Sequence, residues 1–592
     1  MKQANRLSVA ASVRLWFAVC LLLLSPLQPA QAQQTLADAD WFVRPIADGV
    51  VWRYYLFDNM FGSKQSISYL EVDLKNPNVS VETPYLAAAR QRTSVMVPAQ
   101  FPAAAGAING TYFDTTGSGG HRTYLRVNNT VIPPGGALFS PWGWDSAIAK
   151  DSSGSVSIIK MPTGGWAAET THPNIMACGP LLVDAGTIPT AYLNSIGSHC
   201  TSRHPRSAVG VTTDSRLIMV TVDGRTDMAA GMTCTELADI MLQLGCPYAM
   251  NLDGGGSTTL WGRGEQYGGV LNFPSDNSVY DHLGERACSN AVAVIAPTTT
   301  PLAWDARLTG KSFSAFMDSG TSQTVTLTYQ NAGTQTWTAT ATKLSVARPD
   351  TRTSPLRDPA TWPGTTEPAV MSPATVAPGQ TASFTFRFKA PETSTTLTFD
   401  EHFKLVQLGV GRIGPADSEA WMRINVLPPY SGATTFIVES RLGGQNIAWY
   451  TDSGMADTGT NCSAPGVTPG IGSRYGSTYR SVAGAKSATV SPNFPRAGNY
   501  NVYVTWGAGS NRRNPITYKV NHTSGTSVFL IDQTATANVW VRLGSGPFPF
   551  AAGPGGTVVM SNENIDVSGS MYISAVKFEH VPDAAVDDWM LY

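Results

Sequence analysis

Two short segments rich in threonine and proline divide the chain and limit what any one part of it can fold into. They are Thr298–Pro301, which reads TTTP, and Pro428-Pro429. Proline fixes its own backbone angle and cannot donate a hydrogen bond to a sheet, so such clusters mark loops and linkers. With 592 residues the chain also exceeds the size of a single hydrophobic core. We therefore expect several separately folded domains, with boundaries at these two points.

The residues after the first linker, 302–427, are expected to form an all-β domain. TSQTVTLTYQ (321–330) and TASFTFRFKA (381–390) alternate polar and apolar residues, as half-buried strands do, and lie between turn residues. NAGTQTWT (331–338) followed by VAPGQTASFTFRF (376–388) resembles the Ig-like modules that lie between catalytic and binding domains of secreted proteins. No cluster of titratable residues occurs here, which favours a β-sandwich spacer.

A second all-β sandwich is expected at residues 431–582. The order FIVESR, RAGNYNVYVTW, GPGGTVVM and ISAVKFEHV resembles the golvesin C-terminal-like domain, which is related to the carbohydrate-binding tails of some polysaccharide lyases. This resemblance implies polysaccharide binding, for which exposed rings would stack on sugar faces. An aromatic residue in a strand is more often part of the core, so both interpretations stay open for Tyr450, Tyr475, Tyr479 and Trp506.

Residues 1–32 have the pattern of a secretory signal peptide. Lys2, Arg6 and Arg14 precede the apolar run Leu15–Leu24, which is too short to span a bilayer, and Ala30-Gln31-Ala32 offers a cleavage site. No later segment is long and apolar enough for a membrane span. We therefore expect a secreted protein, extracellular or periplasmic, that is not anchored after cleavage.

The charge and cysteine content fit this expectation. The formal net charge is −2, with 40 basic and 42 acidic residues and no basic cluster, which gives no support for a nucleic-acid partner. Outside the leader six cysteines remain, which is compatible with disulfides in an oxidising compartment. Their pairing is open: Cys178–Cys200 is one guess, whereas Cys234 and Cys246 cannot pair if one helix separates them.

The first domain, residues 33–297, is expected to be α+β, with a mixed sheet and packed helices. TELADIMLQLG (235–245) repeats apolar residues at helical spacing. Thr233 with Glu236 three residues later forms a capping-box pattern, in which each side chain accepts from a free backbone N–H at the start of a helix. The same Glu236 is also a candidate catalytic carboxylate.

Four stretches of this domain place polar residues directly after apolar strands, where ligands often bind. Arg203, His204 and Arg206 lie within four residues, and guanidinium groups suit phosphate or carboxylate. Asn109-Gly is also a common hairpin turn. The glycine run Gly254–Gly256 lacks the lysine of a phosphate-binding P-loop and instead predicts a bare backbone surface that a ligand can approach. The candidate residues of the four stretches are Asn109 and Asp114; Arg203, His204 and Arg206; Asp223 and Arg225; and Asn251, Asp253, Gly254, Gly255, Gly256, Ser257 and Thr258.

Six motifs occur in an order and spacing that resemble the phosphodiester glycosidase family, over roughly residues 50–296. They are AINGTYF, MACGPLLVDAG, RHPRSAVG, VDGR, TELADIMLQLG and NLDGGGSTTLW. The resemblance implies hydrolysis of a sugar–phosphate diester, of the N-acetylglucosamine-1-phosphate type, at the anomeric carbon. Tyr112, His204 and Leu260 differ from residues that are common in the family.

A working assignment of roles follows from this chemistry. Cleavage of an anomeric bond develops oxocarbenium character, which carboxylates stabilise. We place Asp253 nearest the anomeric carbon, with Glu236 or Asp223 as the second carboxylate and His204 as a candidate acid. Arg206, with Arg203 or Arg225, would clamp the phosphate, while Asn109, Asp114, Asn251, Ser257 and Thr258 would contact substrate beside the glycine run Gly254, Gly255 and Gly256.

No required metal or other cofactor is expected, because neither the Cys/His spacing of a zinc site nor an EF-hand loop occurs. Two alternatives remain at the level of the sequence. One is an ordinary glycoside hydrolase that acts on an extracellular polysaccharide. The other is a non-catalytic protein that binds polysaccharide.

Overall fold

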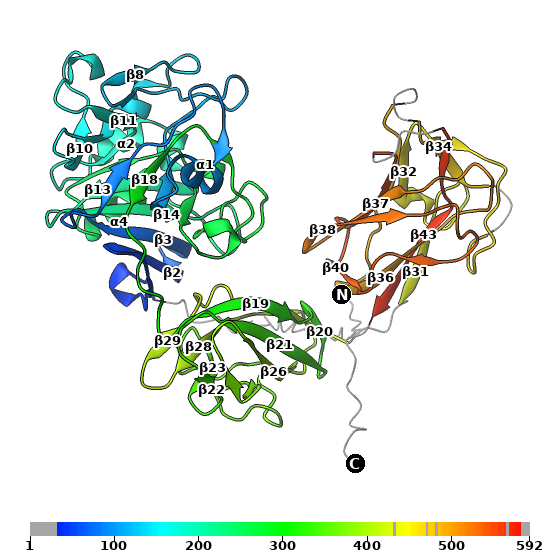
Figure 1. The fold of residues 1–592 in the computed structure, drawn as a ribbon. Coiled ribbons are helices and arrows are strands. Elements are labelled where there is room, and N and C mark those ends of the chain that lie inside the picture. Colours follow the sequence, from blue (N-terminus) through cyan, green and yellow to red (C-terminus); the bar gives the residue numbers. More distant parts are fainter. Residues whose placement is uncertain (1–31, 430–433, 469–471, 480–483, 564–567, 582–592) are drawn as a thin grey trace, which may run out of the picture. The chain divides into compact units, whose positions relative to one another are not determined.

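The computed structural model describes residues 32–429, 434–468, 472–479, 484–563 and 568–581. Residues 1–31 of the predicted signal peptide therefore lie outside the described residues. The chain divides into two compact units, Met1–Thr299 and Thr300–Tyr592, which Figure 1 colours blue to green and green to red. Among the described residues no helix is long and apolar enough to cross a membrane.

The largest sheet of the first unit has seven strands among residues 32–299 and carries much of the site. In spatial order they are β1 (Phe42–Ala47), β2 (Val50–Met60), β3 (Ser63–Asp73), β14 (Arg216–Val222), β13 (Arg206–Val211), β15 (Tyr248–Asn251) and β12 (Leu181–Val183). Strands β13, β14 and β15 are almost wholly buried, as their unbroken apolar runs predict.

The other described strands of this unit form smaller sheets around the first. One contains β10 (Val156–Lys160), β9 (Ser146–Lys150), β11 (Asn174–Cys178), β7 (Leu125–Val127) and β8 (Thr130–Ile132). Another contains β16 (Leu260–Gly262), β6 (Ala104–Asn109), β18 (Ala291–Ile295) and β4 (Ser80–Glu82), and a two-stranded ribbon pairs β17 (Ala287–Cys288) with β5 (Gln91–Arg92). Short 3-10 helices are η1 (Leu36–Asp38), η2 (Pro141–Trp144), η3 (Trp166–Ala168), η4 (Gly255–Ser257) and η5 (Tyr267–Gly269).

The predicted α+β character of this unit is confirmed, but its sheets are antiparallel rather than mixed. Every ladder between two named strands of residues 32–299 runs antiparallel, including β13 with β14 and with β15. Helices are few and short because antiparallel strands need no long crossover connection. They are α1 (Thr93–Gln100), α2 (Thr190–Ser195), α3 (Ser198–Thr201) and α4 (Cys234–Gln243).

Helix α4 begins where the capping-box pattern predicts. Thr233 is the N-cap: its hydroxyl accepts from the backbone N–H of Glu236 (3.1 Å), and the Glu236 carboxylate accepts from that of Thr233 (2.9 Å). Leu237, Ile240 and Met241 are fully buried in one core cluster with residues of β13, β14 and β15. Local sequence alone specifies this helix and its packing face.

One disulfide joins the start of this helix to α3. Cys200 and Cys234 are bonded, with 4.7 Å between their Cα atoms, so the guessed pairing Cys178–Cys200 is wrong. Cys178 is a buried free thiol in β11, and Cys246 is free as well, which agrees with its predicted inability to pair with Cys234. The reason is topological: the antiparallel pair of β13 and β14 returns the chain so that α4 begins beside α3, which spacing does not reveal.

Removing this disulfide is expected to destabilise the first unit. The bridge closes a loop of sequence separation 34, so Cys200→Ala with Cys234→Ala should lower the free energy of unfolding by about 2–4 kcal/mol, since the unfolded chain gains freedom. Calorimetry of the full chain measures this. A reductant should shift the wild-type transition and leave the double variant unchanged. Equal transition temperatures for the two proteins would contradict the prediction.

The regular structure of the second unit's described residues consists of β-strands apart from one short 3-10 helix, and its ladders fall into two sets. The first set covers residues 306–427 and packs around a core that includes Trp337, Phe384 and Phe388. Its strands are β19 (Ala306–Ser312), β20 (Phe316–Asp318), β21 (Ser322–Asn331), β22 (Trp337–Thr338), β23 (Thr342–Val346), β24 (Met371–Ser372), β25 (Thr375–Val376), β26 (Thr381–Lys389), β27 (Leu397–Glu401), β28 (Phe403–Gln407), β29 (Gly411–Ile413) and β30 (Met422–Leu427).

The second set covers residues 435–581 and has its own core, in which Trp506, Tyr500 and Tyr518 are buried. Its strands are β31 (Thr435–Glu439), β32 (Tyr450–Ser453), β33 (Ala456–Asp457), β34 (Arg474–Ser477), β35 (Ser487–Val490), β36 (Gly498–Thr505), β37 (Ile516–His522), β38 (Gly525–Ile531), β39 (Val541–Arg542), β40 (Phe548–Phe550), β41 (Thr557–Ser561), β42 (Ser570–Ile573) and β43 (Ala575–Val581), with η6 (Ile447–Trp449). The prediction of two β-sandwich domains after an α+β domain is confirmed.

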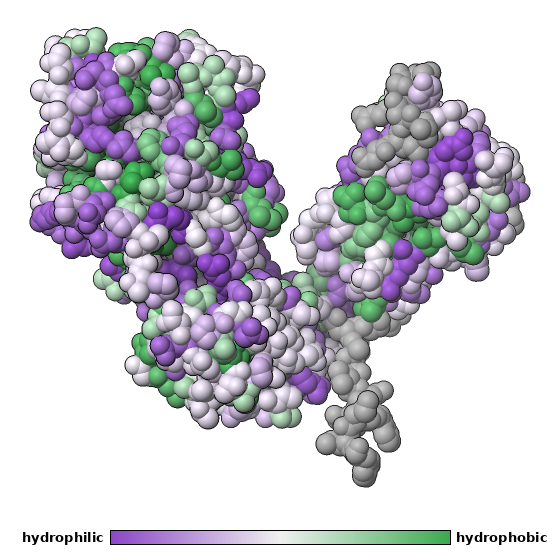
Figure 2. All heavy atoms as spheres, viewed as in Figure 1, coloured by the Kyte–Doolittle hydropathy of each residue, from purple (hydrophilic) through white to green (hydrophobic). Residues whose placement is uncertain are grey.

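The aromatic residues singled out for glycan stacking are mostly part of this core. Trp506 is 1% exposed, and Tyr450 and Tyr475 pack against the core cluster, whereas Tyr479 is 41% exposed. Apolar residues gather over the β37–β38 part of this domain (Figure 2), where Val528 and Leu530 of the edge strand β38 are exposed. These two side chains are aliphatic and offer no ring for stacking on a sugar.

Candidate functional site

A cavity of about 320 Å³ lies in the first unit, where loops after several strands meet. One carboxylate, several cations and a group of aromatic rings face it. The lining residues are Tyr112, Phe113, Thr115, Arg122, Phe139, His199, His204, Arg206, Arg225, Asp253, Gly254, Gly255 and Arg286.

Backbone contacts between two strand ends position Asp253. Its N–H donates to the carbonyl of Gly110 (3.0 Å), and its own carbonyl accepts from the side-chain amide of Asn109 (2.6 Å). The amide oxygen of Asn109 accepts from the Ser207 hydroxyl (2.7 Å) and the Thr259 N–H (3.0 Å). Asn109 ends β6 and is fully buried, so it connects three segments instead of lining the cavity.

The three glycines after Asp253 allow the chain to pass close to its neighbours. A Cβ on Gly254 would lie 2.7 Å from the Pro205 carbonyl oxygen, and one on Gly256 would lie 1.7 Å from an oxygen of Asp276. Gly255 has φ +63°, a left-handed conformation that favours glycine, and lies under the guanidinium of Arg225. The glycine run therefore forms part of the floor of the cavity and brings the Arg225 cation over it.

Burial in this floor raises the pKa of Asp253 to about 6. The nearby Ser257 hydroxyl and the Arg286 cation oppose this rise, because both favour the ionised carboxylate. Arg286 is itself held by a two-pronged ion pair with Asp276, at 2.7 and 2.6 Å. The cavity thus contains a carboxylate that gains and loses its proton close to neutral pH.

Arg206 begins β13 and is 1% exposed, yet it lines the cavity. Its Nε donates to the Met232 carbonyl (2.8 Å), and its Nη2 donates to the carbonyls of His199 (2.5 Å) and Ser202 (3.0 Å). Burial lowers its pKa to about 10, so the side chain remains a cation at neutral pH. Arg206 therefore orders the chain around the cavity and supplies positive charge to it.

His204 and Arg225 add to the polar side of the cavity. The backbone of His204 pairs with that of Met232 (3.2 and 3.0 Å), which fixes the loop in which it lies. Burial lowers the pKa of His204, and the cations Arg206 and Arg225 lower it further, so the imidazole is neutral at neutral pH. Such a ring donates or accepts a hydrogen bond but adds no charge.

Aromatic rings form another wall of the cavity. Tyr112 is stacked on Phe139, with 4.4 Å between ring centroids and 10° between planes. Trp142 contacts both rings edge-on, and Phe113 and His199 lie on the same lining. One cavity therefore combines an apolar wall with a cationic one and a single carboxylate among the described lining residues.

The two residues considered as a second carboxylate lie elsewhere. Glu236 caps α4 and forms an ion pair with Arg203 (2.6 Å), whose guanidinium also donates to Ser63 and Phe61. Asp223 is buried and accepts from the Ser66 hydroxyl (2.5 Å), the Asn272 amide and the Phe273 N–H (both 2.9 Å). Burial raises its pKa. Neither carboxylate, nor Arg203, lines the cavity.

Other predicted contact residues also support the backbone around the cavity. Asp114 accepts from the N–H groups of its own turn, at residues 116–118. Asn251 is buried and donates to the Tyr112 hydroxyl and the Gly179 carbonyl, both at 3.0 Å. Gly256, the last residue of the glycine run, and the following Ser257 and Thr258 are buried and do not line the cavity. Of the predicted residues, the structure brings His204, Arg206, Arg225, Asp253, Gly254 and Gly255 to the cavity.

Sequence reasoning missed His199, Phe139, Arg122 and Arg286 as lining residues. Arg286 lies 30 positions after Gly256, the last residue of the glycine run, and no local pattern marks it. His199 had one signal, since it adjoins a cysteine in the segment before the RHPR motif. His199, Cys200 and Cys234 place one donor atom each within 4.8 Å, but both sulfurs are committed to the disulfide and leave only the imidazole to offer a metal.

Comparison with known proteins adds two family matches. Residues 103–295 match the family model described as phosphodiester glycosidase, and residues 454–580 match that of the Golvesin C-terminal domain.

Two curated relatives share short regions with the chain. The xanthan lyase of Bacillus sp. (strain GL1) is 36% identical over 127 residues, which are 21% of this chain and 13% of the lyase. The SPbeta prophage-derived uncharacterized protein YomE of Bacillus subtilis (strain 168) is 43% identical over 56 residues, which are 10% of this chain and 9% of that protein. The matches thus cover only a small part of either relative.

Similar solved structures include the catalytic domain of zebrafish N-acetylglucosamine-1-phosphodiester alpha-N-acetylglucosaminidase, auto-inhibited by its pro-peptide. It aligns with a TM-score of 0.35 at 20% identity, over 42% of this chain and 84% of that one. The Paenibacillus xanthan lyase aligns with a TM-score of 0.22 at 14% identity, over 93% of this chain and 57% of that one.

Proposed function

We propose that this chain, with a phosphodiester glycosidase domain at residues 103–295 and a Golvesin C-terminal domain at 454–580, is an exported hydrolase of sugar-1-phosphodiesters. It would cleave the bond at the anomeric carbon and release a sugar and a phosphomonoester. The observation that carries this proposal is the cavity in which Asp253 lies with Arg206, Arg225 and Arg286.

The cationic wall suits the phosphate. Arg225 is exposed and Arg206 is buried, so one cation meets the entering diester while the other is already fixed in place. Fixed positive charge stabilises the negative charge that builds up on a departing phosphate, because no reorganisation is needed during the reaction. A phosphate monoester is a good leaving group. The reaction therefore depends less on a second carboxylate that acts as an acid than does the hydrolysis of a glycoside whose leaving group is an alcohol.

The carboxylate suits the anomeric carbon. An oxocarbenium-like centre is stabilised by a nearby carboxylate, and an attacking water needs a group that accepts its proton. A base is most effective when its pKa lies near the working pH, and the pKa of Asp253 is raised to about 6. We therefore assign Asp253 as the group that activates water next to the anomeric carbon.

The aromatic wall suits the sugar. The stacked rings of Tyr112 and Phe139 present an apolar surface on the same cavity, and a pyranose offers an apolar face of C–H groups. The relationship to xanthan lyase, together with the Golvesin domain, supports an extracellular polysaccharide or cell-wall glycan as the context of the substrate. Export is further supported by the disulfide, which forms in oxidising compartments.

An assay with two substrates tests the proposal. The full-length protein is incubated with N-acetylglucosamine-1-phospho-methylmannoside and, separately, with nitrophenyl N-acetylglucosaminide. Release of free sugar from the diester is the expected result. Cleavage of the nitrophenyl glycoside alone would identify an ordinary glycoside hydrolase, and glycan binding without turnover of either compound would identify a binding protein.

The pH profile should have an acid limb at about 6. A carboxyl that accepts a proton must be ionised, so kcat/KM should fall about tenfold per pH unit as the pH drops below the raised pKa of Asp253. The pKa of His199 is lowered to about 4, so this ring adds no step near pH 6, and burial together with Arg206 and Arg225 also lowers the pKa of His204 from its ordinary value. A rate that instead falls as pH rises through 6 would make Asp253 an acid.

Asp145 provides the matched control for this profile. Burial raises its pKa to about 6 as well, but it binds Tyr192, Ser146 and the Leu181 N–H and does not line the cavity. Asp145→Asn should therefore keep the acid limb of the wild type. Loss of the limb in this variant would assign it to Asp145.

A further inference from the structure

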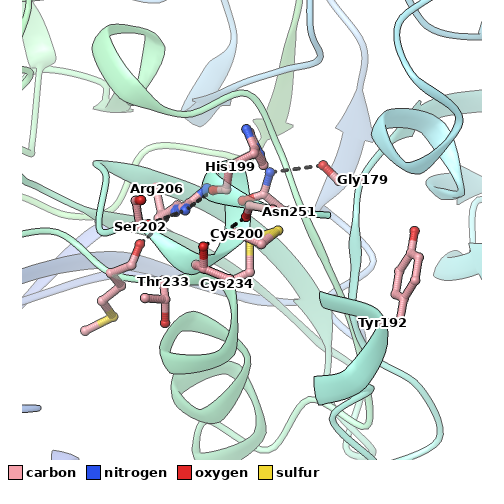
Figure 3. The surroundings of a disulfide bond; sticks show 12 residues. Gly179, Tyr192, His199, Cys200, Ser202, Arg206, Thr233, Cys234 and Asn251 are labelled. Atoms are coloured by element: carbon pink, nitrogen blue, oxygen red, sulfur yellow. Dashed lines mark hydrogen bonds between the residues drawn. A yellow bond between two sulfur atoms is a disulfide. The ribbon is translucent and has the colours of Figure 1, made fainter. Parts of the chain in front are cut away.

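His199 lines the cavity and is held by three kinds of contact with the rest of the site. Its main-chain carbonyl accepts from Arg206 (2.5 Å), and its neighbour Cys200 is bonded to Cys234 at the start of α4. The centroid of its ring lies 4.5 Å from the centroid of the Trp142 ring. Figure 3 shows the disulfide between the His199–Ser202 segment and the helix, with Arg206 beside it. The imidazole is thus fixed before any ligand arrives.

The hydrogen bonds around Tyr112 favour one tautomer of the His199 ring. The Tyr112 hydroxyl donates its single hydrogen to the Gly179 carbonyl (2.9 Å) and accepts from the Asn251 amide (3.0 Å). We assign this hydrogen to the Gly179 carbonyl, so His199 Nε2, which lies 3.1 Å from the same hydroxyl, is the donor of that contact. The proton is therefore on Nε2, and Nδ1 carries a lone pair.

Within the described residues, Nδ1 has no hydrogen-bond partner, and the ring lines the cavity. Apart from the Asp253 carboxylate, the charged and aromatic groups of the lining are cations and rings, so the complement of this acceptor is a hydrogen-bond donor of the ligand, such as a hydroxyl of the sugar. Burial and the neighbouring Arg206 and His204 lower the pKa of His199 to about 4, which keeps the acceptor unprotonated at neutral pH. The same shift makes the ring a weaker base than Asp253, so binding suits it better than water activation.

We propose that His199 is a specificity-determining residue whose Nδ1 accepts a hydrogen bond from one hydroxyl of the pyranose ring. This inference rests on the proposed function, since it takes the ligand to be a sugar 1-phosphate. The cations then hold the phosphate, while His199 distinguishes sugars that carry this hydroxyl from those that lack it. A site built around such a hydrogen bond rejects the deoxy sugar, because its own acceptor stays unpaired.

Binding measurements with product-like probes test the proposal. Calorimetry compares glucose 1-phosphate, its 2-, 3-, 4- and 6-deoxy analogues and inorganic phosphate on the wild type, His199→Leu and His199→Asn. Loss of one hydrogen bond that leaves a partner unpaired weakens binding about 5- to 100-fold. We expect the wild type to bind one deoxy analogue more weakly than glucose 1-phosphate by this factor. His199→Leu should bind glucose 1-phosphate more weakly than the wild type does by the same factor, but should bind that analogue as well as the wild type does.

His199→Asn supplies the rescue, because its amide oxygen lies near the place of Nδ1. It should regain most of the discrimination, and all three proteins should bind inorganic phosphate equally. A His199→Leu variant that weakens every probe by the same factor, phosphate included, would show a structural role and overturn the proposal. So would a wild type that binds no sugar 1-phosphate.

A parallel turnover assay separates this inference from the proposed function. If no phosphodiester is hydrolysed but binding still depends on one sugar hydroxyl, the proposed reaction is wrong and the recognition by His199 stands. Normal hydrolysis, with the binding of the deoxy analogues unaffected by residue 199, would support the proposed reaction and contradict the recognition by His199.

Discussion

Asp253→Asn is expected to lower kcat for the sugar-1-phosphodiester by about 10²–10⁴-fold, the range lost when a positioned proton acceptor is removed. The amide keeps the size of the side chain and leaves the backbone contacts to Asn109 and Gly110 unchanged. It cannot accept a proton from water or balance positive charge on the sugar. KM should change little, because the cations Arg206 and Arg225 still hold the phosphate.

Steady-state kinetics with thermal unfolding measured on the same samples checks this result. Asp239→Asn is the matched control: Asp239 lies on α4, outside the cavity, and its bond from Gln243 survives the change. An Asp253→Asn enzyme with wild-type kcat and unchanged stability would exclude Asp253 from the chemistry.

Arg206→Met is expected to destabilise the first unit and to remove phosphate binding together. Methionine fills much of the same space but leaves the carbonyls of His199, Ser202 and Met232 without their donor. Buried polar groups without partners cost about 1–3 kcal/mol each, and partial access of water to this loop reduces the sum, so we expect a loss of about 2–4 kcal/mol in unfolding free energy. Denaturant unfolding measures it.

Arg225→Met removes a cation from the cavity without removing a buried hydrogen bond of the described residues, so it separates the effect of charge on binding from the effect on stability. Arg225 lines the cavity but is exposed, so its loss should weaken phosphate binding with a change in stability within about 0.5 kcal/mol. If Arg206→Met were as stable as Arg225→Met, the three carbonyl contacts would not be a main support of the site.

The parts of the fold that local sequence specifies could be predicted. Thr233 and Glu236 begin α4 through contacts three residues apart, and the alternation in β21 and β26 directly reflects which face is buried. The antiparallel order of the first unit's sheets was not predictable, since buried strands have continuous apolar runs in either arrangement. The disulfide partner of Cys200 depends on the same long-range order.

The candidate site was predictable where its residues belong to a short motif next to the end of a strand. His204, Arg206 and Asp253 belong to such motifs and meet in the cavity. Glu236 and Asp223 resemble Asp253 in sequence, because each is an acid beside a loop, but the carboxylate oxygens of both accept hydrogen bonds from neighbouring residues. Arg286 and Phe139 reach the cavity from distant segments, so only the folded chain reveals them.

The most direct test of the central claim is the fate of solvent oxygen. Hydrolysis of the sugar-1-phosphodiester in ¹⁸O-labelled water, followed by mass spectrometry of both products, shows which bond breaks. Attack at the anomeric carbon, which Asp253 and the cationic wall are proposed to promote, places the label in the released sugar and none in the phosphomonoester. Label in the phosphomonoester would mean attack at phosphorus and would contradict a glycosidase.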